Sequence, residues 1–363
     1  MIYLDNAATT PMSAVALAEM TKVMQETHGN PSSIHSHGRH AGKLLREARQ
    51  ELAHLLGTKP QRIFFTSGGT ESNNTAIIGY CLRHQERGKH IITTAIEHHS
   101  VLETIDYLVQ HFGFEATIIQ PVNQEITAQQ IQEALRDDTI LVSTMYANNE
   151  TGSLLPIAEI GRVLKEHPAA YHVDAVQALE QVPELLAIGR IDLLSLSAHK
   201  FHGPRGVGIL YKKAGRKIQS LLTGGGQEKT ERSTTENLPG IVATTKAMRM
   251  YLEAPHPMKE IRDYLWSFLE QQHQIKIFSP KDGVDHILCF ALKGVRGEVL
   301  VHAFEEEDIY ISTTSACSSK KSDSSSTLAA MNVPDYWATS AVRASFSYLN
   351  TMDEAKQFVE VLE

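Results

Sequence analysis

The stretch 192-DLLSLSAHKFHGPRGVG-208 decides the fold. Its apolar run ends at Ser197, and Lys200 follows just ahead of a turn rich in glycine and proline. Such a pattern predicts a buried strand that opens into a loop. A lysine at the mouth of a buried sheet is poorly solvated, so the pKa of its amine falls and the neutral amine can form a Schiff base with a carbonyl cofactor. Taken alone, the segment is more typical of a surface lysine at a strand end.

The chain on both sides of this stretch alternates between strand and helix patterns. Strands are predicted at 62–65, 89–94, 139–144, 170–174, 191–197 and 206–211, and helices at 70–87, 99–111, 127–136 and 156–166. This alternation implies βαβ units and a mostly parallel sheet. Ligands of such sheets bind beyond the carboxyl ends of the strands, so we expect the chemistry in the loops that follow them.

Two of these loops carry groups that suit a phosphorylated ring. Asp174 ends a predicted strand, where a carboxylate can keep a pyridine nitrogen protonated, although aspartate at such a place is also a common helix N-cap. The loop 66-TSGGTESNN-74 lets the backbone approach a ligand, and the next helix offers free N–H groups to a phosphate. It matches neither a P-loop nor a G-x-G-x-x-G turn.

Two further loops add side chains of the same kind. His98 and His99 follow another strand, where a histidine can stack on a planar ring or move protons, although a lone histidine is more often structural. Asn148 and Asn149 can cap a turn or donate to a ring hydroxyl. Together with Lys200, these groups occur in the order that a site for pyridoxal 5'-phosphate (PLP) requires.

Composition and charge argue against several classes of protein. The net charge is -8 and there is no basic run, which argues against a dedicated nucleic-acid binder. We expect no membrane span and no signal peptide, because no apolar run reaches about 18 residues and the start lacks a basic region before an apolar one. Cys81, Cys289 and Cys317 lie far apart, which fits a reducing cytosol better than disulfides or a zinc cluster. Cys81 and Cys289 lie in apolar runs, so we expect them in the core.

The length of 363 residues exceeds one compact core and predicts two domains. Pro255 and Pro257 mark a boundary, after which strand and helix patterns mix. We expect a large domain at 13–254 and a smaller α+β domain made of 1–12 and 255–363.

Along nearly its whole length, the chain resembles a known family, the cysteine desulfurases of the NifS/IscS type. These belong to the class V aminotransferase group of fold-type I PLP enzymes. The matching motifs are YLDNAATTP at 3–11, GNPSSIHSHG at 29–38, FTSGGTESNN at 65–74, EHHSV at 97–101, NNETG at 148–152, HVDAVQ at 172–177, SLSAHKFHGPRGVG at 195–208 and SAC at 315–317. The resemblance implies a mostly parallel sheet of the seven-stranded type in the large domain. It also implies PLP as cofactor and L-cysteine as substrate.

The resemblance assigns roles by position. Lys200 is similar to the Schiff-base lysine and catalytic base, Asp174 to the partner of the pyridine nitrogen, and His98 to the residue that stacks on the ring and shuttles a proton. Arg343 matches the arginine that clamps the substrate carboxylate. Thr235 matches a threonine that reaches the phosphate from the neighbouring subunit, which implies a homodimer. The remaining matches contact the phosphate, the ring oxygen or the substrate: Gly69, Thr70, Ser197, His199, Gln177 and Asn149.

Cys317, in the polar stretch 312–327, matches the catalytic cysteine. In the family its thiolate attacks the sulfur of L-cysteine, which leaves a persulfide and releases alanine. The persulfide then passes to an acceptor, such as an iron–sulfur scaffold, a tRNA-thiolation enzyme or a thio-cofactor carrier. The cations of Lys320 and Lys321 would favour the thiolate, and a stretch with few apolar anchors would let the thiol move.

The chain departs from the family pattern at two loop positions and at its end. Thr234 and Thr314 stand where the family usually has glycine, so we expect changed loop mobility or turnover rather than lost chemistry. The sequence ends without the extended tail that some members use to dock a scaffold, which leaves the acceptor open.

Two alternatives remain open at this level. Another PLP enzyme of the same fold, a selenocysteine lyase, β-lyase or aminotransferase, would share the cofactor residues but would not need Cys317. A metal-binding or structural module could instead use clustered histidines, namely His35, His37, His40, His199 and His202.

Overall fold

The computed structural model describes residues 1–314 and 325–363. Its large sheet has the strand order β2-β8-β7-β6-β5-β3-β4. The strands are β2 (Ile63–Thr66), β3 (His90–Thr94), β4 (Glu115–Ile119), β5 (Thr139–Met145), β6 (Ala170–Asp174), β7 (Leu193–Ser197) and β8 (Gly208–Lys212). Neighbours from β4 to β7 run parallel, while β8 runs antiparallel to both β7 and β2. The predicted α/β class with a mostly parallel seven-stranded sheet is confirmed.

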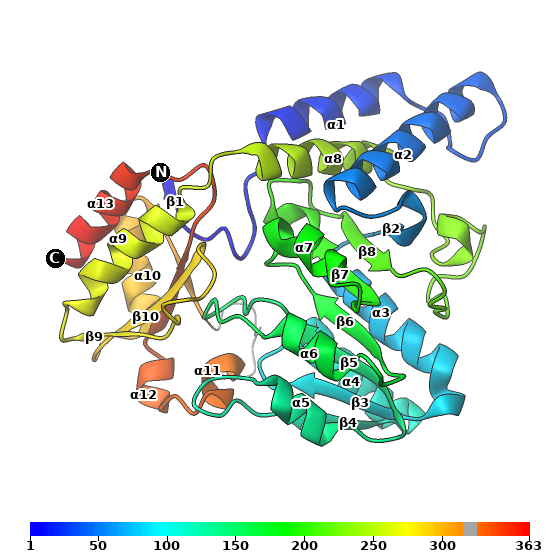
Figure 1. The fold of residues 1–363 in the computed structure, drawn as a ribbon. Coiled ribbons are helices and arrows are strands. Elements are labelled where there is room, and N and C mark those ends of the chain that lie inside the picture. Colours follow the sequence, from blue (N-terminus) through cyan, green and yellow to red (C-terminus); the bar gives the residue numbers. More distant parts are fainter. Residues whose placement is uncertain (315–324) are drawn as a thin grey trace.

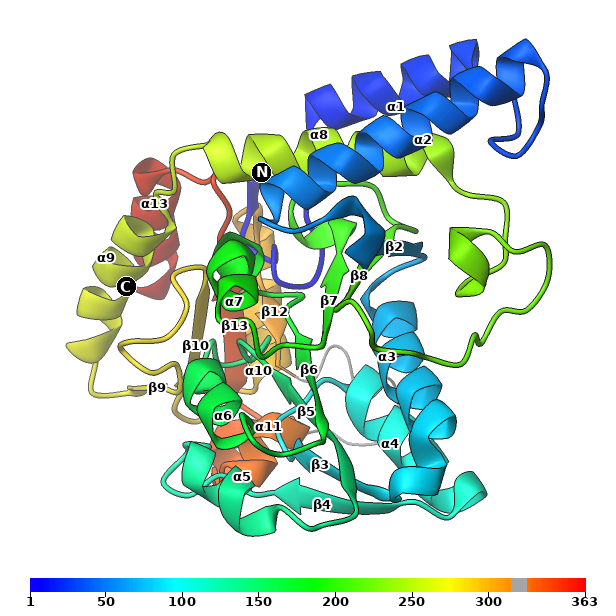
Figure 2. The same ribbon diagram turned by 45° about the vertical axis from the view of Figure 1, so that its right-hand side comes forward.

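Helices cover both faces of this sheet, as Figure 2 shows. One face carries α3 (Gly69–His84) and α4 (His99–Phe112), and the other carries α5 (Ala128–Ala134), α6 (Ile157–Val163) and α7 (Val182–Ala187). Successive strand residues therefore enter different cores: Ile91 packs with α3 and α4, whereas Ile92 packs with the helices of the opposite face. Burial of both faces explains why the strands read as nearly continuous apolar runs.

Three long helices pack beside one another at one end of the large sheet (Figure 1). They are α1 (Ala14–Glu26), α2 (Ser36–Leu55) and α8 (Leu238–Glu253). The chain from β8 to α8 contains only a short 3-10 turn, Glu228–Thr230, within a long loop.

The C-terminal part builds a second sheet with the order β12-β13-β10-β9. Its strands are antiparallel: β9 (Ile275–Ile277), β10 (Ile287–Leu292), β12 (Ser312–Thr313) and β13 (Ala341–Ser345). Beside it, β1 (Ile2–Tyr3) pairs in parallel with β11 (Ile309–Tyr310). The helices of this part are α9 (Met258–Glu270), α10 (Gly297–Glu306), α11 (Ser326–Ala330), α12 (Asp335–Ala338) and α13 (Met352–Leu362).

A separate hydrophobic cluster joins the N-terminal segment to this C-terminal part. Ile2 and Leu4 are buried with Phe290, Phe304 and Phe358, and both chain ends lie in this region (Figure 1). The cluster supports the predicted division into 13–254 and 1–12 with 255–363, which stays a prediction.

Two smaller expectations can be checked against the described residues. Cys81 and Cys289 are free thiols that are fully buried in the core, as predicted, and burial raises the pKa of both. In the part of the chain that the structure describes, no helix combines the length and apolar character needed to cross a bilayer.

Candidate active site

A cavity of ≈ 230 Å³ opens at the carboxyl ends of β6 and β7, between the large sheet and β13. A liquid water occupies about 30 Å³, so the cavity can hold a ligand larger than one water. It brings together the predicted residues Gly69, Thr70, His98, Asn149, Asp174, Gln177, Ser197, His199, Lys200 and Arg343.

Asp174 forms the floor of the cavity. It is the last residue of β6, and its side chain is 6% exposed. Its Oδ1 accepts from the Val176 N–H at 3.0 Å, and its Oδ2 accepts from Asn73 Nδ2 at 2.7 Å. The carboxylate is therefore fixed by two donors while it faces the cavity, as an acceptor for a ring N–H must be.

His98 is held in one tautomer by its neighbours. Its Nδ1 accepts from the Ser100 N–H at 3.1 Å and contacts Ser100 Oγ at 2.8 Å, and that hydroxyl accepts from Asn73 Nδ2 at 2.9 Å. Burial lowers the pKa of His98, and the Lys200 charge lowers it further, against the raising effect of Asp174. The ring is thus neutral at pH 7, with its proton on Nε2.

Lys200 lies at the end of the 3-10 turn Ala198–Lys200, directly after β7. Its Nζ donates to the carbonyl oxygens of Ala7 and Ala8 in the N-terminal segment. The side chain borders the main cavity and also a second chamber of ≈ 170 Å³. Two backbone carbonyls of the N-terminal segment therefore help to orient the Lys200 amine.

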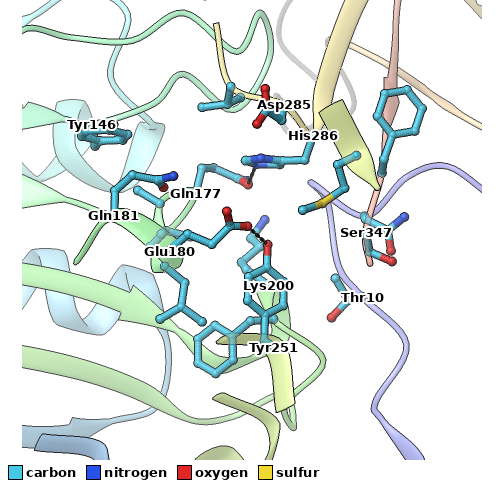
Figure 3. A pocket seen from close by; sticks show the side chains of 18 of the residues that line it. Thr10, Tyr146, Gln177, Glu180, Gln181, Lys200, Tyr251, Asp285, His286 and Ser347 are labelled. Atoms are coloured by element: carbon cyan, nitrogen blue, oxygen red, sulfur yellow. Dashed lines mark hydrogen bonds between the residues drawn. The ribbon is translucent and has the colours of Figure 1, made fainter. Parts of the chain in front are cut away.

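The second chamber, drawn in Figure 3, lies on the other side of Gln177 and Lys200. Gln177 Nε2 donates to the Ala7 carbonyl at 2.9 Å, which leaves its Oε1 to accept from His286 Nε2 at 3.3 Å. Burial lowers the pKa of His286 to about 4, with further lowering by Arg343 and Lys200. His286 is therefore a neutral donor that fixes the orientation of the Gln177 amide.

The turn before α3 fits a phosphate. A Cβ on Gly69 would lie 2.9 Å from Val176 Cγ2, so the turn has no room for a side chain there. The free N–H groups of the first turn of α3 face the same opening as Ser197 and His199. Ser197 Oγ is buried and has no hydrogen-bond partner among the described residues, as expected of a donor that awaits a ligand oxygen. With Asp174 at the floor, these residues fit a planar ring that carries a phosphate.

Arg343, on β13, approaches the cavity from the second sheet and is 3% exposed. Its Nη1 donates to the Asn149 carbonyl at 2.7 Å, and its Nη2 pairs with Asp5 at 2.8 Å. Its Nε is buried with no partner among the described residues. This fixed guanidinium can receive a substrate carboxylate.

One predicted residue does not line the cavity, and another lies outside the described residues. Thr235 is exposed in the loop before α8 and does not line it. Cys317 lies outside the described residues, as do Lys320 and Lys321. Thr234, which stands for a family glycine, is not among the residues with a positive φ, so its position does not require glycine.

The structure adds residues that the sequence analysis did not single out. Asn73 and Ser100 link Asp174 to His98, and Asp5 holds Arg343. Asn73 lies one helical turn after Gly69, on the same face of α3, which was the available signal. Asp5 had no such signal because it reaches the site only through the pairing of distant segments.

The clustered histidines have other partners. His35 caps α2, His199 contacts Thr9 Oγ1 at 3.1 Å, and His202 contacts the Pro11 carbonyl at 2.8 Å. Within residues 1–314 and 325–363, no group of three or more His, Cys, Asp or Glu side chains could hold a metal ion.

Comparison with known proteins gives concordant results. Residues 2–358 match the family described as aminotransferase class-V. The chain is 49% identical to a NifS/IcsS protein homolog of Lactobacillus delbrueckii subsp. bulgaricus, over 100% of this chain and 96% of that protein. It is 40% identical to a cysteine desulfurase IscS of Dictyoglomus turgidum, over 100% of this chain and 93% of that protein.

The solved structures agree with the sequence relatives. A NifS-like protein superimposes with a TM-score of 0.90 at 35% identity, covering 99% of this chain and 97% of that one.

Proposed function

The chain belongs to the aminotransferase class-V family, and we propose that it is a PLP-dependent cysteine desulfurase. One observation carries the proposal: a single cavity gathers Lys200, Asp174, His98 and Arg343, together with an anion-binding turn. The relatives named NifS or cysteine desulfurase match along nearly their whole length. No observation favours the selenocysteine lyase or aminotransferase alternative.

PLP, when bound, supplies an electron sink for a carbanion at the substrate Cα. Asp174 holds the proton on the ring nitrogen, since its fixed carboxylate lies on the cavity floor. Lys200 Nζ would hold the cofactor and would serve as the base for the proton at Cα. Ser197, His199, Gly69 and Thr70 hold the phosphate. These assignments rest on position in the cavity and on the resemblance.

The substrate is oriented by its own charges. Arg343 is fixed by Asp5 and by the Asn149 carbonyl, so a bidentate contact with the carboxylate of L-cysteine needs little reorganisation. His98 has Nδ1 occupied by Ser100, so its Nε2 is the atom that exchanges a proton with the substrate thiol. Asn149 and Gln177 complete the contacts to the substrate and the ring oxygen.

Cys317 accepts the sulfur. Its thiolate attacks the substrate sulfur, the carbon–sulfur bond breaks with its electron pair on carbon, and that carbon takes up a proton. The net change converts L-cysteine and the Cys317 thiol into L-alanine and a Cys317 persulfide, with all atoms conserved.

The described residues that flank 315–324 support this role. Ser312 pairs with Arg343 in the sheet, and Thr327 Oγ1 donates to Glu150 at 3.1 Å, next to Asn149. The described residues on both sides of this segment therefore lie next to Arg343 and Asn149, which line the cavity.

The finer partners belong to the same proposal. The acceptor is a protein of iron–sulfur cluster assembly, tRNA thiolation or thio-cofactor synthesis, and the enzyme binds neither nucleic acid nor membrane directly. Thr235 supports a homodimer, because it is exposed in its own chain and does not line its own cavity. The buried free thiols Cys81 and Cys289 support a reducing, cytoplasmic location.

The test is to add L-cysteine without reductant to the purified protein and to map the products. We expect alanine release and one additional sulfur atom on the peptide that carries Cys317. The peptides with the buried Cys81 and Cys289 serve as controls in the same digest and should stay unmodified. Cys317→Ala should keep PLP but lose sulfur transfer, and undiminished desulfuration in that variant would contradict the proposal.

A further inference from the structure

Glu71 places a negative charge at the opening where the phosphate is expected to bind. It lies in the first turn of α3 and lines the same opening as Gly69, Thr70, Ser197 and His199. Its Oε2 accepts from the Ser67 N–H at 2.7 Å. Burial would raise its pKa, but hydrogen bonds from Arg232 and Ser67 lower it, so the carboxylate is ionised at pH 7.

Arg232 pairs with this carboxylate through both nitrogens that face it. Its Nε donates to Oε1 at 2.5 Å and its Nη2 donates to Oε2 at 2.9 Å. The side chains of Arg232 and Glu71 are only 16% and 19% exposed, so solvent screens the pair weakly. The contact is local to the opening although the residues are far apart in sequence.

The loop that carries Arg232 is anchored independently. Glu228, four residues earlier, accepts from the Phe65 N–H at 3.0 Å on β2 and forms a buried ion pair with Arg49. Its own φ and those of Lys229 and Thr230 are positive, a backbone state that non-glycine residues rarely adopt and that the surrounding contacts must stabilise. The anchor keeps the loop beside the strand that leads into the turn.

The charge balance of the opening depends on this pair and on Arg205, which also lines the opening. A phosphate that binds at the first turn of α3 gains from the helix N–H groups but is repelled by an uncompensated carboxylate in the same turn. We propose that Arg232 is a positioning residue for the cofactor phosphate, which neutralises Glu71 and so keeps the opening attractive to a dianion. This inference rests on the proposed function for the identity of the anion.

The experiment is a double-mutant cycle on the binding of PLP to the apoprotein, followed by absorbance, with inorganic phosphate as a competing probe. Arg232→Gln should raise the Kd for PLP roughly tenfold or more, because it exposes the Glu71 charge to the phosphate. Glu71→Gln keeps the acceptor for Ser67 and removes the repulsive charge, so its Kd should stay within about threefold of the wild type. The double variant should return to within about threefold as well.

The difference between the Kd values of the two single variants distinguishes charge neutralisation from simple bracing of the loop. A pair that only braces the loop would weaken binding in both single variants, and the double variant would not recover. That result, or an unchanged Kd in Arg232→Gln, would overturn the inference. The Kd for inorganic phosphate should follow the same order, since the repulsion acts on the phosphate and not on the ring.

Controls separate folding and cofactor identity from the inference. Arg249→Gln removes another arginine–glutamate pair, in which two nitrogens of Arg249 donate to Glu51 Oε1 away from the opening, and should leave the Kd unchanged. Arg232→Lys retains the charge and should lie between the wild type and Arg232→Gln. If the wild type bound no PLP at all, the proposed function would fail; a wild type that binds PLP without the asymmetry would contradict only the role of Arg232.

Discussion

At the scale of single residues, the proposed role of Asp174 depends most strongly on its charge. In the proposed function its carboxylate stabilises positive charge on the ring nitrogen, and Asp174→Asn offers a neutral amide of the same shape. We expect alanine formation to slow on the order of a hundredfold, as for other lost electrostatic contacts in active sites. Asp285→Asn is the matched control, because this exposed carboxylate lines only the second chamber. Comparable losses in both variants, measured as kcat, would contradict the assignment.

Arg343 is expected to act on substrate binding. Arg343→Lys keeps the charge but loses the planar fork that matches a carboxylate, so KM for L-cysteine should rise about tenfold or more. PLP binding should change little, because the phosphate and ring contacts come from other residues. A variant with an unchanged KM and a lowered PLP content would assign Arg343 to the cofactor instead.

His172 illustrates a residue whose protonation state affects stability. Burial lowers its pKa to about 4, and it contacts Ser143 Oγ at 2.8 Å and Ser195 Oγ at 3.0 Å. The folded state therefore resists a proton that the unfolded chain accepts below about pH 6.5, so stability is lost as the pH falls from about 6.5 to 4. For one such histidine this loss amounts to at most about 3 kcal/mol.

Unfolding experiments on the apoprotein between pH 7 and 4 test this point. His172→Gln should be less stable at pH 7 but should show a shallower loss of stability on acidification. The exposed His273 provides a control, since His273→Gln should leave the slope unchanged. Identical slopes in all three proteins would show that His172 does not contribute.

At the scale of elements, the turn before α3 has a strict steric requirement at Gly69. Gly69→Ala would place a Cβ 2.9 Å from Val176 Cγ2, whereas a Cβ on Gly68 would meet Ser197 Oγ at 3.8 Å, an ordinary contact. Gly68 has an extended φ of 160°. We expect Gly69→Ala to weaken PLP binding about tenfold and Gly68→Ala to bind like the wild type. Equal titration curves for the two variants would refute this account of the turn.

The strands of the large sheet were predictable where burial on both faces produces a nearly continuous apolar run in the sequence. The helices between them were predictable from their helical spacing of apolar residues. The strand at Glu115–Ile119 was missed, because β4 lies at the sheet edge and most of its residues are only partly buried or exposed. The candidate site residues at the ends of β6 and β7 were predictable, because ligands of parallel sheets bind beyond the carboxyl ends of the strands. The contacts of Asp5, Ala7 and Ala8 were not, since they depend on the N-terminal segment reaching back across the sheet.

At the scale of the whole molecule, the proposed homodimer implies that each site borrows Thr235 from the other subunit. A mixture of Lys200→Ala and Thr235→Val proteins should then contain hybrids with one intact site. Random exchange yields about a quarter of the wild-type activity at limiting PLP, because half of the dimers are hybrids and each has one of two sites intact. Thr235→Val alone should bind PLP more weakly, and a mixture that merely averages its parents would rule out sharing.

The central claim is that the cavity binds PLP through Lys200. The most direct measurement is borohydride reduction of the purified protein, followed by digestion and mass spectrometry of the lysine peptides. The account predicts a pyridoxyl group on the peptide that contains Lys200 and on no other. A pyridoxyl group on another lysine, or none in protein purified with PLP present, would contradict it.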